Sequence, residues 1–126
     1  MKRLLRFSVS FLVIAAAAYW AVLPFCGLIY GCGCTFESGI RYCNIFEPDP
    51  PHCPWCQLDT LAFWSLFAGN LALTAPIIWI GLSRIRNSVS VGLASGATGY
   101  FFWATLAGLV LALYFEYPTL YGLRIG

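Results

Sequence analysis

Charged residues are scarce in this chain of 126 residues: they make up 10% of it, against 60% hydrophobic residues. A soluble domain carries about 25% charged residues, so the composition excludes an ordinary one. Three stretches hold no charge and exceed the ~20 apolar residues that cross a bilayer core: residues 7–33, 60–83 and 87–115. The sequence therefore predicts a single-domain, all-α integral membrane protein over residues 1–126, with spans at about 7–30, 57–83 and 89–115.

No histidine lies in these spans, and no aspartate, glutamate, lysine or arginine lies near the middle of one. The only histidine of the chain, His52, lies between the first and the second span. A haem held within the membrane by histidines of this chain is therefore excluded. Without an ionisable group at mid-membrane there is also no proton relay or ion path. We do not expect a transporter or pump that works alone.

Five of the seven basic residues lie on one side of the predicted spans: Lys2, Arg3, Arg6, Arg84 and Arg86. The other side holds all five acidic residues together with Arg41 and Arg124. The positive-inside rule places the N-terminus in the cytoplasm, and the loop at about 31–56 and the C-terminus outside, in the periplasm if the cell is bacterial. The first apolar run is longer than the ~7–15 residues of the apolar region in a signal peptide, so we expect it to be kept as an anchor. The sequence has no basic patch with interleaved aromatic residues, so we expect no nucleic-acid partner.

What the chain does have is cysteine, concentrated in and next to the predicted outer loop. The six residues are Cys26, Cys32, Cys34, Cys43, Cys53 and Cys56. An oxidising compartment favours disulfides, and all six cysteines are disulfide candidates. Six cysteines allow 15 sets of three bridges, among which the sequence does not choose. Each bridge would stabilise the proline-rich loop by about 2–4 kcal/mol, which predicts covalent stapling.

The segment "PHCPWC" suggests a redox alternative. Proline is favoured at the first helical position, so Pro54 predicts Cys53 as the N-cap of the second span and Cys56 one turn later. A helix N-terminus favours the thiolate, which is the attacking species in disulfide exchange. A Cys-x-x-Cys pair at the outer end of a membrane helix resembles the DsbB and vitamin K epoxide reductase families. The resemblance implies a thiol–disulfide oxidoreductase with Cys53 and Cys56 as the quinone-facing pair and two of Cys32, Cys34 and Cys43 as the shuttle pair.

A third interpretation is a metal site. Its candidate ligands are Cys32, Cys34, Cys43, His52, Cys53 and Cys56. Soft ligands of this kind bind copper(I), zinc or an iron–sulfur cluster. The sequence itself requires no cofactor. The metal interpretation implies one, a metal ion or an iron–sulfur cluster in the outer loop.

Small residues recur on one face of the third span, at Gly92, Gly96, Gly99 and Gly108. Such positions let membrane helices approach closely. The chain has more packing features than catalytic ones, so the leading prediction is a small accessory subunit of a larger membrane complex, of the energy-converting or electron-transfer kind. Its expected partners are the lipid bilayer and other membrane subunits or a second copy. The oxidoreductase and the extracytoplasmic metal-binding protein remain the alternatives.

Overall fold

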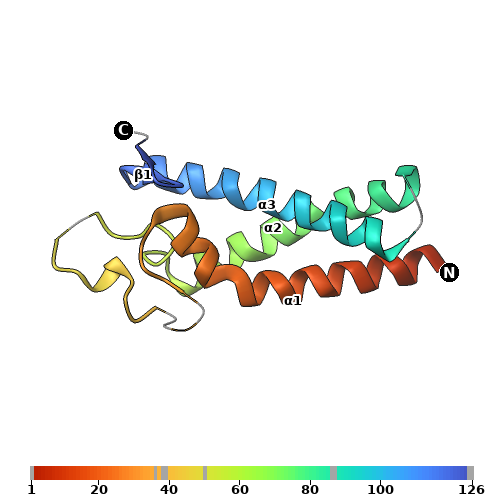
Figure 1. Ribbon diagram of the computed structural model, residues 1–126, viewed down its shortest axis with the longest axis horizontal. Coiled ribbons are helices and arrows are strands. Elements are labelled where there is room, and N and C mark those ends of the chain that lie inside the picture. Colours follow the sequence, from red (N-terminus) through yellow and green to blue (C-terminus); the bar gives the residue numbers. More distant parts are fainter. Residues whose placement is uncertain (1, 36, 38–39, 50, 86–87, 125–126) are drawn as a thin grey trace. The chain divides into compact units, whose positions relative to one another are not determined.

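The computed structural model describes residues 2–35, 37, 40–49, 51–85 and 88–124, and the described chain is mostly helical (Figure 1). Helix α1 covers Lys2–Tyr30, α2 covers Thr60–Ile80 and α3 covers Val89–Tyr114, while η2, Gly81–Ile85, continues α2 as a π-helical turn. All three helices are long and apolar enough to cross a membrane, which confirms the prediction of three apolar helices. Arg86 and Asn87, part of the predicted inner turn, lie outside the described residues. The orientation in the bilayer stays a prediction.

Helix α1 ends at a glycine, as helices often do. Gly31 has φ +64°, a left-handed conformation that costs glycine little, and its N–H donates to the carbonyl of Gly27 at 2.8 Å. The chain can therefore turn sharply directly after Tyr30, toward Cys32 and Cys34.

Helix α2 begins later than the sequence indicates, and the prediction of Cys53 as its N-cap is wrong. The Gln57 N–H donates to the Cys53 carbonyl at 3.1 Å, but this single turn does not continue into the helix, which starts at Thr60. Asp59 caps α2 instead, because its Oδ1 accepts the Ala62 N–H at 2.7 Å. Aspartate is among the best N-cap residues. Pro54 therefore begins only a short local turn, and not the helix.

The chain forms two compact units, and each of the three helices contributes to both. The first unit contains residues 1–19 and 65–104, the second residues 20–64 and 105–126. In the first unit the helices approach closely at α3 glycines. A Cβ atom added to Gly96 would lie 2.9 Å from Ile14 of α1 and 3.0 Å from Ile78 of α2, and one added to Gly99 would lie 2.7 Å from Ile77. Larger side chains would separate the helices here.

Two further glycines of α3 meet α1. In the first unit, a Cβ atom on Gly92 would collide with the Ser10 hydroxyl. In the second unit, one on Gly108 would lie 3.2 Å from Ile29, and the Tyr30 hydroxyl donates to the Gly108 carbonyl at 2.8 Å. The same small-residue spacing thus serves packing within each unit.

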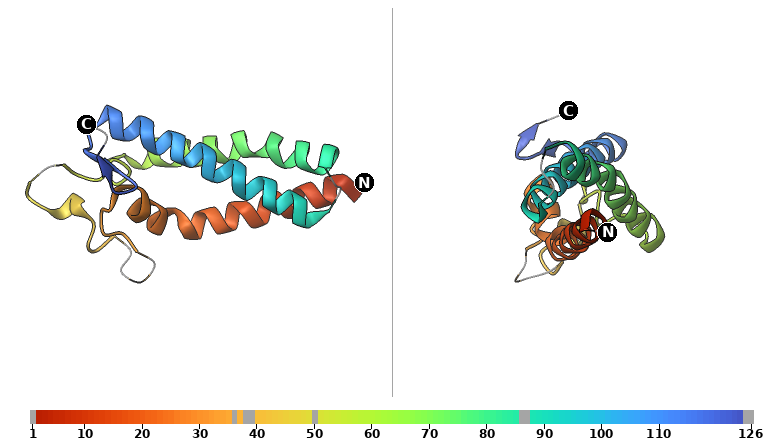
Figure 2. Two further views of the ribbon diagram at one scale, coloured as in Figure 1. Left: turned by 45° about the horizontal axis from the view of Figure 1, so that its top comes forward. Right: turned by 90° about the vertical axis from the view of Figure 1, so that its right-hand side faces the viewer.

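The second unit also contains two short elements that the all-α prediction omits. A single 3-10 turn, η1, covers Asn44–Phe46, and strands β1 (Thr119–Leu120) and β2 (Leu123–Arg124) form an antiparallel hairpin. Tyr121 and Gly122 turn the hairpin with φ values of 51° and 74°. The hairpin lies beside the last turns of α1 and α3 (Figure 2), because the Tyr121 N–H donates to the Ile29 carbonyl at 2.6 Å and the Tyr121 hydroxyl bonds Thr105 at 2.7 Å.

Candidate metal centre

All six cysteines lie close together in the second unit. Their Sγ atoms form a continuous set of contacts: Cys26 lies 3.0 Å from Cys53 and 3.3 Å from Cys32, Cys32 lies 3.4 Å from Cys34, and Cys43 lies 3.1 Å from Cys56. Cys34 to Cys56, at 3.8 Å, connects the remaining thiols. The sulfur atoms thus occupy one volume, and all six thiols are free in the structure. The predicted disulfides stay a prediction.

Four triads of sulfur atoms could each hold a metal ion, since the three atoms of each triad lie within 4.8 Å of one another. The triads are Cys26–Cys32–Cys53, Cys26–Cys34–Cys56, Cys32–Cys34–Cys43 and Cys43–Cys53–Cys56. Within this set of four, every cysteine belongs to two triads, and any two triads share one cysteine. None of the four triads contains a carboxylate or an imidazole nitrogen. The donor set is therefore purely thiol sulfur, which soft metal ions prefer.

Glycine is what allows the first three cysteines to meet. Cys26 lies in the last turns of α1, and the segment with Cys32 and Cys34 folds back over that helix end. A Cβ atom on Gly27 would collide with the Cys34 carbonyl, and one on Gly33, whose φ is +86°, would collide with the Tyr42 carbonyl. The first contact brings residues 32–34, the cysteine segment, against α1. The second brings the later part of the loop, at Tyr42, against that segment.

Asn44 ties the loop that carries the other three cysteines to Cys32 and to Cys53. Its backbone N–H donates to the Cys32 carbonyl at 3.0 Å, and its Oδ1 accepts the Cys53 N–H at 2.7 Å. Its Nδ2 donates to the Pro51 carbonyl and to the Tyr117 hydroxyl, both at 3.0 Å. One side-chain amide therefore joins the two halves of the loop to the segment after α3.

Tyr117 continues this network to α1. Its hydroxyl donates to the Tyr30 carbonyl at 3.1 Å, and the two rings meet edge to face with centroids 5.3 Å apart. Glu116, directly before Tyr117, has a left-handed backbone with φ +52°. The chain turns at this residue after α3. Burial raises the pKa of the Tyr117 hydroxyl, so it remains a neutral donor.

His52 does not belong to the sulfur triads. Its Nδ1 lies 2.9 Å from the carbonyl oxygen of Asn44. Cys26, which the sequence-based ligand set omits, belongs to two triads. The sequence signal for Cys26 is its place one turn before the glycine that ends α1, six residues ahead of Cys32.

The thiols are shielded from water and differ in acidity. Cys53 is 0% exposed and Cys43 2%, whereas Cys56 is only half-buried. Burial raises the pKa of the Cys43 thiol to about 12, while hydrogen bonds from Cys26 and Cys53 lower the pKa of the Cys32 thiol. Six thiolates this close together, five of them buried, would repel one another, so a fully ionised set needs cations among the sulfurs.

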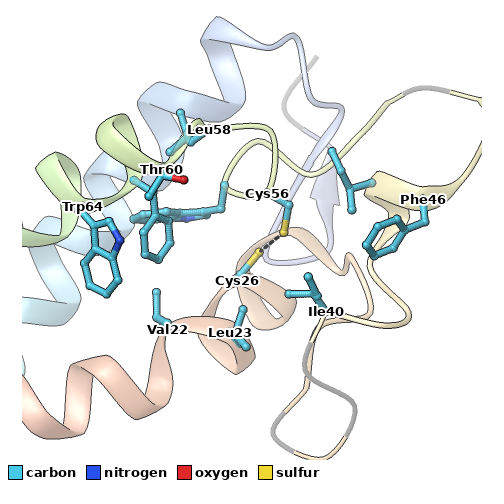
Figure 3. Close-up of a pocket in the computed structure, with 12 residues that line it drawn as sticks. Val22, Leu23, Cys26, Ile40, Phe46, Cys56, Leu58, Thr60 and Trp64 are labelled. Carbon is cyan, nitrogen blue, oxygen red and sulfur yellow. Dashed lines mark hydrogen bonds between the residues drawn. The ribbon is translucent and has the colours of Figure 1, made fainter.

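An apolar pocket of about 400 Å³ opens beside the cluster (Figure 3). Cys26 and Cys56 line it, with their sulfurs turned toward each other at 4.0 Å, and so do Trp55, Phe63 and Trp64. The Trp55 ring packs edge to face on Phe63, with centroids 6.0 Å apart. Its buried indole N–H has no hydrogen-bond partner among the described residues. An apolar molecule in this pocket would lie against both cysteines.

Comparison of the chain with protein-family models, with curated proteins and with solved structures found no significant match.

Proposed function

We propose that this chain is a membrane protein that binds soft metal ions through its six cysteine thiolates, on the extracytoplasmic side of a membrane. The observation that carries the proposal is the convergence of all six sulfurs into four triads, each within 4.8 Å. Three of the six come from the end of α1 and the turn after it, and three from the loop before α2, so separate segments converge on one volume.

The chemistry of the donors supports soft ions. Thiolate sulfur selects copper(I) and zinc over magnesium or calcium, which require oxygen ligands. The triads hold no carboxylate. The burial of five of the cysteines favours a site from which water is excluded. Metal binding would displace the thiol protons and supply the positive charge that a set of buried thiolates needs.

The distribution of charge in the chain supports the orientation. Lys2, Arg3 and Arg6 lie at the beginning of α1, and the cysteines lie at its end and beyond. The positive-inside rule then puts the cluster on the extracytoplasmic face. A metal-binding accessory subunit of a membrane complex fits both this orientation and the packing glycines of α3.

The metal content of the purified chain tests the proposal. The full chain is reduced and kept under anaerobic conditions in mild detergent, loaded with copper(I) or zinc, desalted and measured by elemental analysis. We expect metal to be retained through desalting. The same protein alkylated at its cysteines should retain none, while Glu47→Ser, a substitution at an exposed residue of the same loop, should retain as much as the unaltered chain. A reduced chain that retains no soft metal would contradict the proposal.

A second candidate function rests on the pocket. Cys26 and Cys56 line an apolar cavity with aromatic walls, which suits a quinone. Two thiols would lose two electrons and two protons and form a disulfide, and the quinone would gain both and become a quinol. We expect such a protein to reduce an added quinone when supplied with dithiol. Equal quinone reduction by the Cys26→Ser, Cys56→Ser double variant would rule this candidate out.

A further inference from the structure

The way in which the triads share their sulfurs specifies more than a metal site. Four triads with three sulfurs each use only six cysteines because each cysteine serves two triads. Any two triads share one sulfur, so the triads relate to one another as the corners of a tetrahedron, and each sulfur corresponds to one of its six edges. An ion in every triad would therefore be joined to each of the other three ions by one bridging sulfur.

We propose that the six cysteines hold a tetranuclear copper(I) cluster, in which each of four copper ions binds three thiolates and each thiolate bridges two copper ions. The inference rests on the proposed function, since it specifies the ion and its number at the same site. Copper(I) is soft and accepts three-coordinate thiolate sites, and a thiolate sulfur has lone pairs enough to bind two ions.

The distances suit three-coordinate ions. A bond of about 2.3 Å between a thiolate sulfur and an ion of this size places the three sulfurs of a trigonal site about 4 Å apart. The closest sulfur contacts run from 3.0 Å for Cys26–Cys53 to 4.0 Å for Cys26–Cys56, within triads whose limit is 4.8 Å. Binding would therefore need the sulfurs to shift by about 1 Å or less.

Zinc fits this arrangement less well. A structural zinc site needs four sulfurs that are all neighbours of one another. The triads leave out three sulfur pairs, namely Cys26–Cys43, Cys32–Cys56 and Cys34–Cys53, and any four of the six sulfurs include at least one of these pairs. The contacts thus favour trigonal over tetrahedral coordination.

The charges also permit four monovalent ions that use every thiol. Six thiols and four copper(I) ions give a cluster with net charge 2− and six released protons, so atoms and charge balance without any change of oxidation state. One zinc ion bound by four thiolates would carry the same net charge of 2−, but it would leave two of the six thiols protonated and without a metal. Four copper(I) ions engage all six sulfurs at that same residual charge, so the desolvation cost of the charge is no greater.

Titration with copper(I) tests the inference. The full chain, reduced and in mild detergent under anaerobic conditions, is mixed with one to six equivalents of copper(I) acetonitrile complex and measured by native mass spectrometry. Because every sulfur is shared, we expect the free chain and the four-copper species to dominate below four equivalents. X-ray absorption of the loaded chain should show three sulfur neighbours and further copper neighbours around each copper.

Single substitutions separate a shared cluster from independent sites. Cys56→Ser removes one sulfur from two of the four triads, so bound copper should fall at least twofold and the four-copper species should disappear. Glu47→Ser, in the same loop and outside the triads, should leave the four-copper species in place. Helicity by circular dichroism and a single peak in size exclusion verify folding. Cys34→Ser, which also affects two triads, gives the same test if Cys56→Ser fails to fold.

The outcomes distinguish the inference from the proposed function. One ion per chain, a statistical mixture of one, two and three copper ions, or a firmly bound zinc ion with tetrahedral sulfur neighbours would overturn the tetranuclear cluster and leave a soft-metal protein. A fully reduced chain that binds neither copper(I) nor zinc would overturn both.

Discussion

The six cysteines differ in how far solvent reaches them. Cys56 is half-buried and lines the apolar pocket, whereas the other five cysteines are buried. Reagents and incoming ions should therefore meet the cluster at Cys56 first.

Alkylation rates check this order. When the reduced, metal-free chain is treated with a limiting amount of N-ethylmaleimide, we expect Cys56 to be modified before the other cysteines, because thiol reactivity requires access. Peptide mass spectrometry over a time course identifies the modified positions. Faster modification of Cys53, which is 0% exposed, would show that the cluster opens in solution.

Asn44 connects three parts of the second unit, since its side-chain amide bonds Cys53, Pro51 and Tyr117. Asn44→Asp keeps the size and the acceptor but removes both N–H donors. We expect a loss of about 1–3 kcal/mol of stability, because the Pro51 carbonyl would then face a carboxylate. The matched change Gln57→Glu removes the exposed hydrogen bond to the His52 carbonyl and should cost less.

Thermal unfolding of the two amide variants in the same detergent measures this difference. The unfolding midpoint should fall clearly for Asn44→Asp and little for Gln57→Glu. Equal shifts for both variants would contradict the assigned role of Asn44.

At the scale of elements, α1 and the cysteine segment meet where glycine permits it. A Cβ atom on Gly27 would collide with the Cys34 carbonyl, whereas one on Gly69 of α2 has nothing within 4 Å. We expect Gly27→Ala to destabilise the chain by about 1–3 kcal/mol through overpacking. Gly69→Ala should be neutral or stabilising by up to about 1 kcal/mol, since alanine is the better helix former.

Metal retention and the unfolding midpoint are measured for both variants, Gly27→Ala and Gly69→Ala. Gly27→Ala should reduce metal retention and lower the unfolding midpoint. The added methyl group would displace Cys34, which belongs to two of the four triads. Unchanged metal retention in Gly27→Ala would mean that the cluster does not depend on this contact.

The elements also show what sequence reasoning can reach. Long uncharged runs are enough to predict α1, α2 and α3, because a single helix of that length satisfies its backbone hydrogen bonds within the segment. The predicted start of α2 is wrong because the sequence offers two N-cap positions. Asp59 caps the helix through its side chain, whereas Pro54 only favours a turn. The hairpin of β1 and β2 was missed because strands of two residues leave no periodic pattern.

The site was predictable only in part for a related reason. The sequence shows the cysteines as ligand candidates, but a ligand set predicted from the loop omits Cys26 because that residue belongs to a helix. His52 was included for its neighbours in sequence, and only the fold directs its ring toward Asn44. Convergence of sulfurs from α1 and from the loop depends on turns at Gly31 and Gly33, which spacing alone does not specify.

At the scale of the whole molecule, the central prediction is its orientation in the membrane. On a cysteine-free background, Glu47→Cys should react with a membrane-impermeant maleimide in intact cells, because the loop is expected outside. Ser83→Cys, next to the basic residues after α2, should react only after the membrane is permeabilised. The reverse pattern would place the cluster in the cytoplasm.

Trp55 connects the cluster to a signal that can be observed directly. It stands between Cys53 and Cys56, is buried, and packs on Phe63. Indole emission depends on the polarity around the ring and is quenched by nearby soft metal ions, so each molecule contains an optical reporter of its own cluster. The difference in fluorescence between the unaltered chain and Trp55→Phe would follow occupancy in native vesicles, without any added dye.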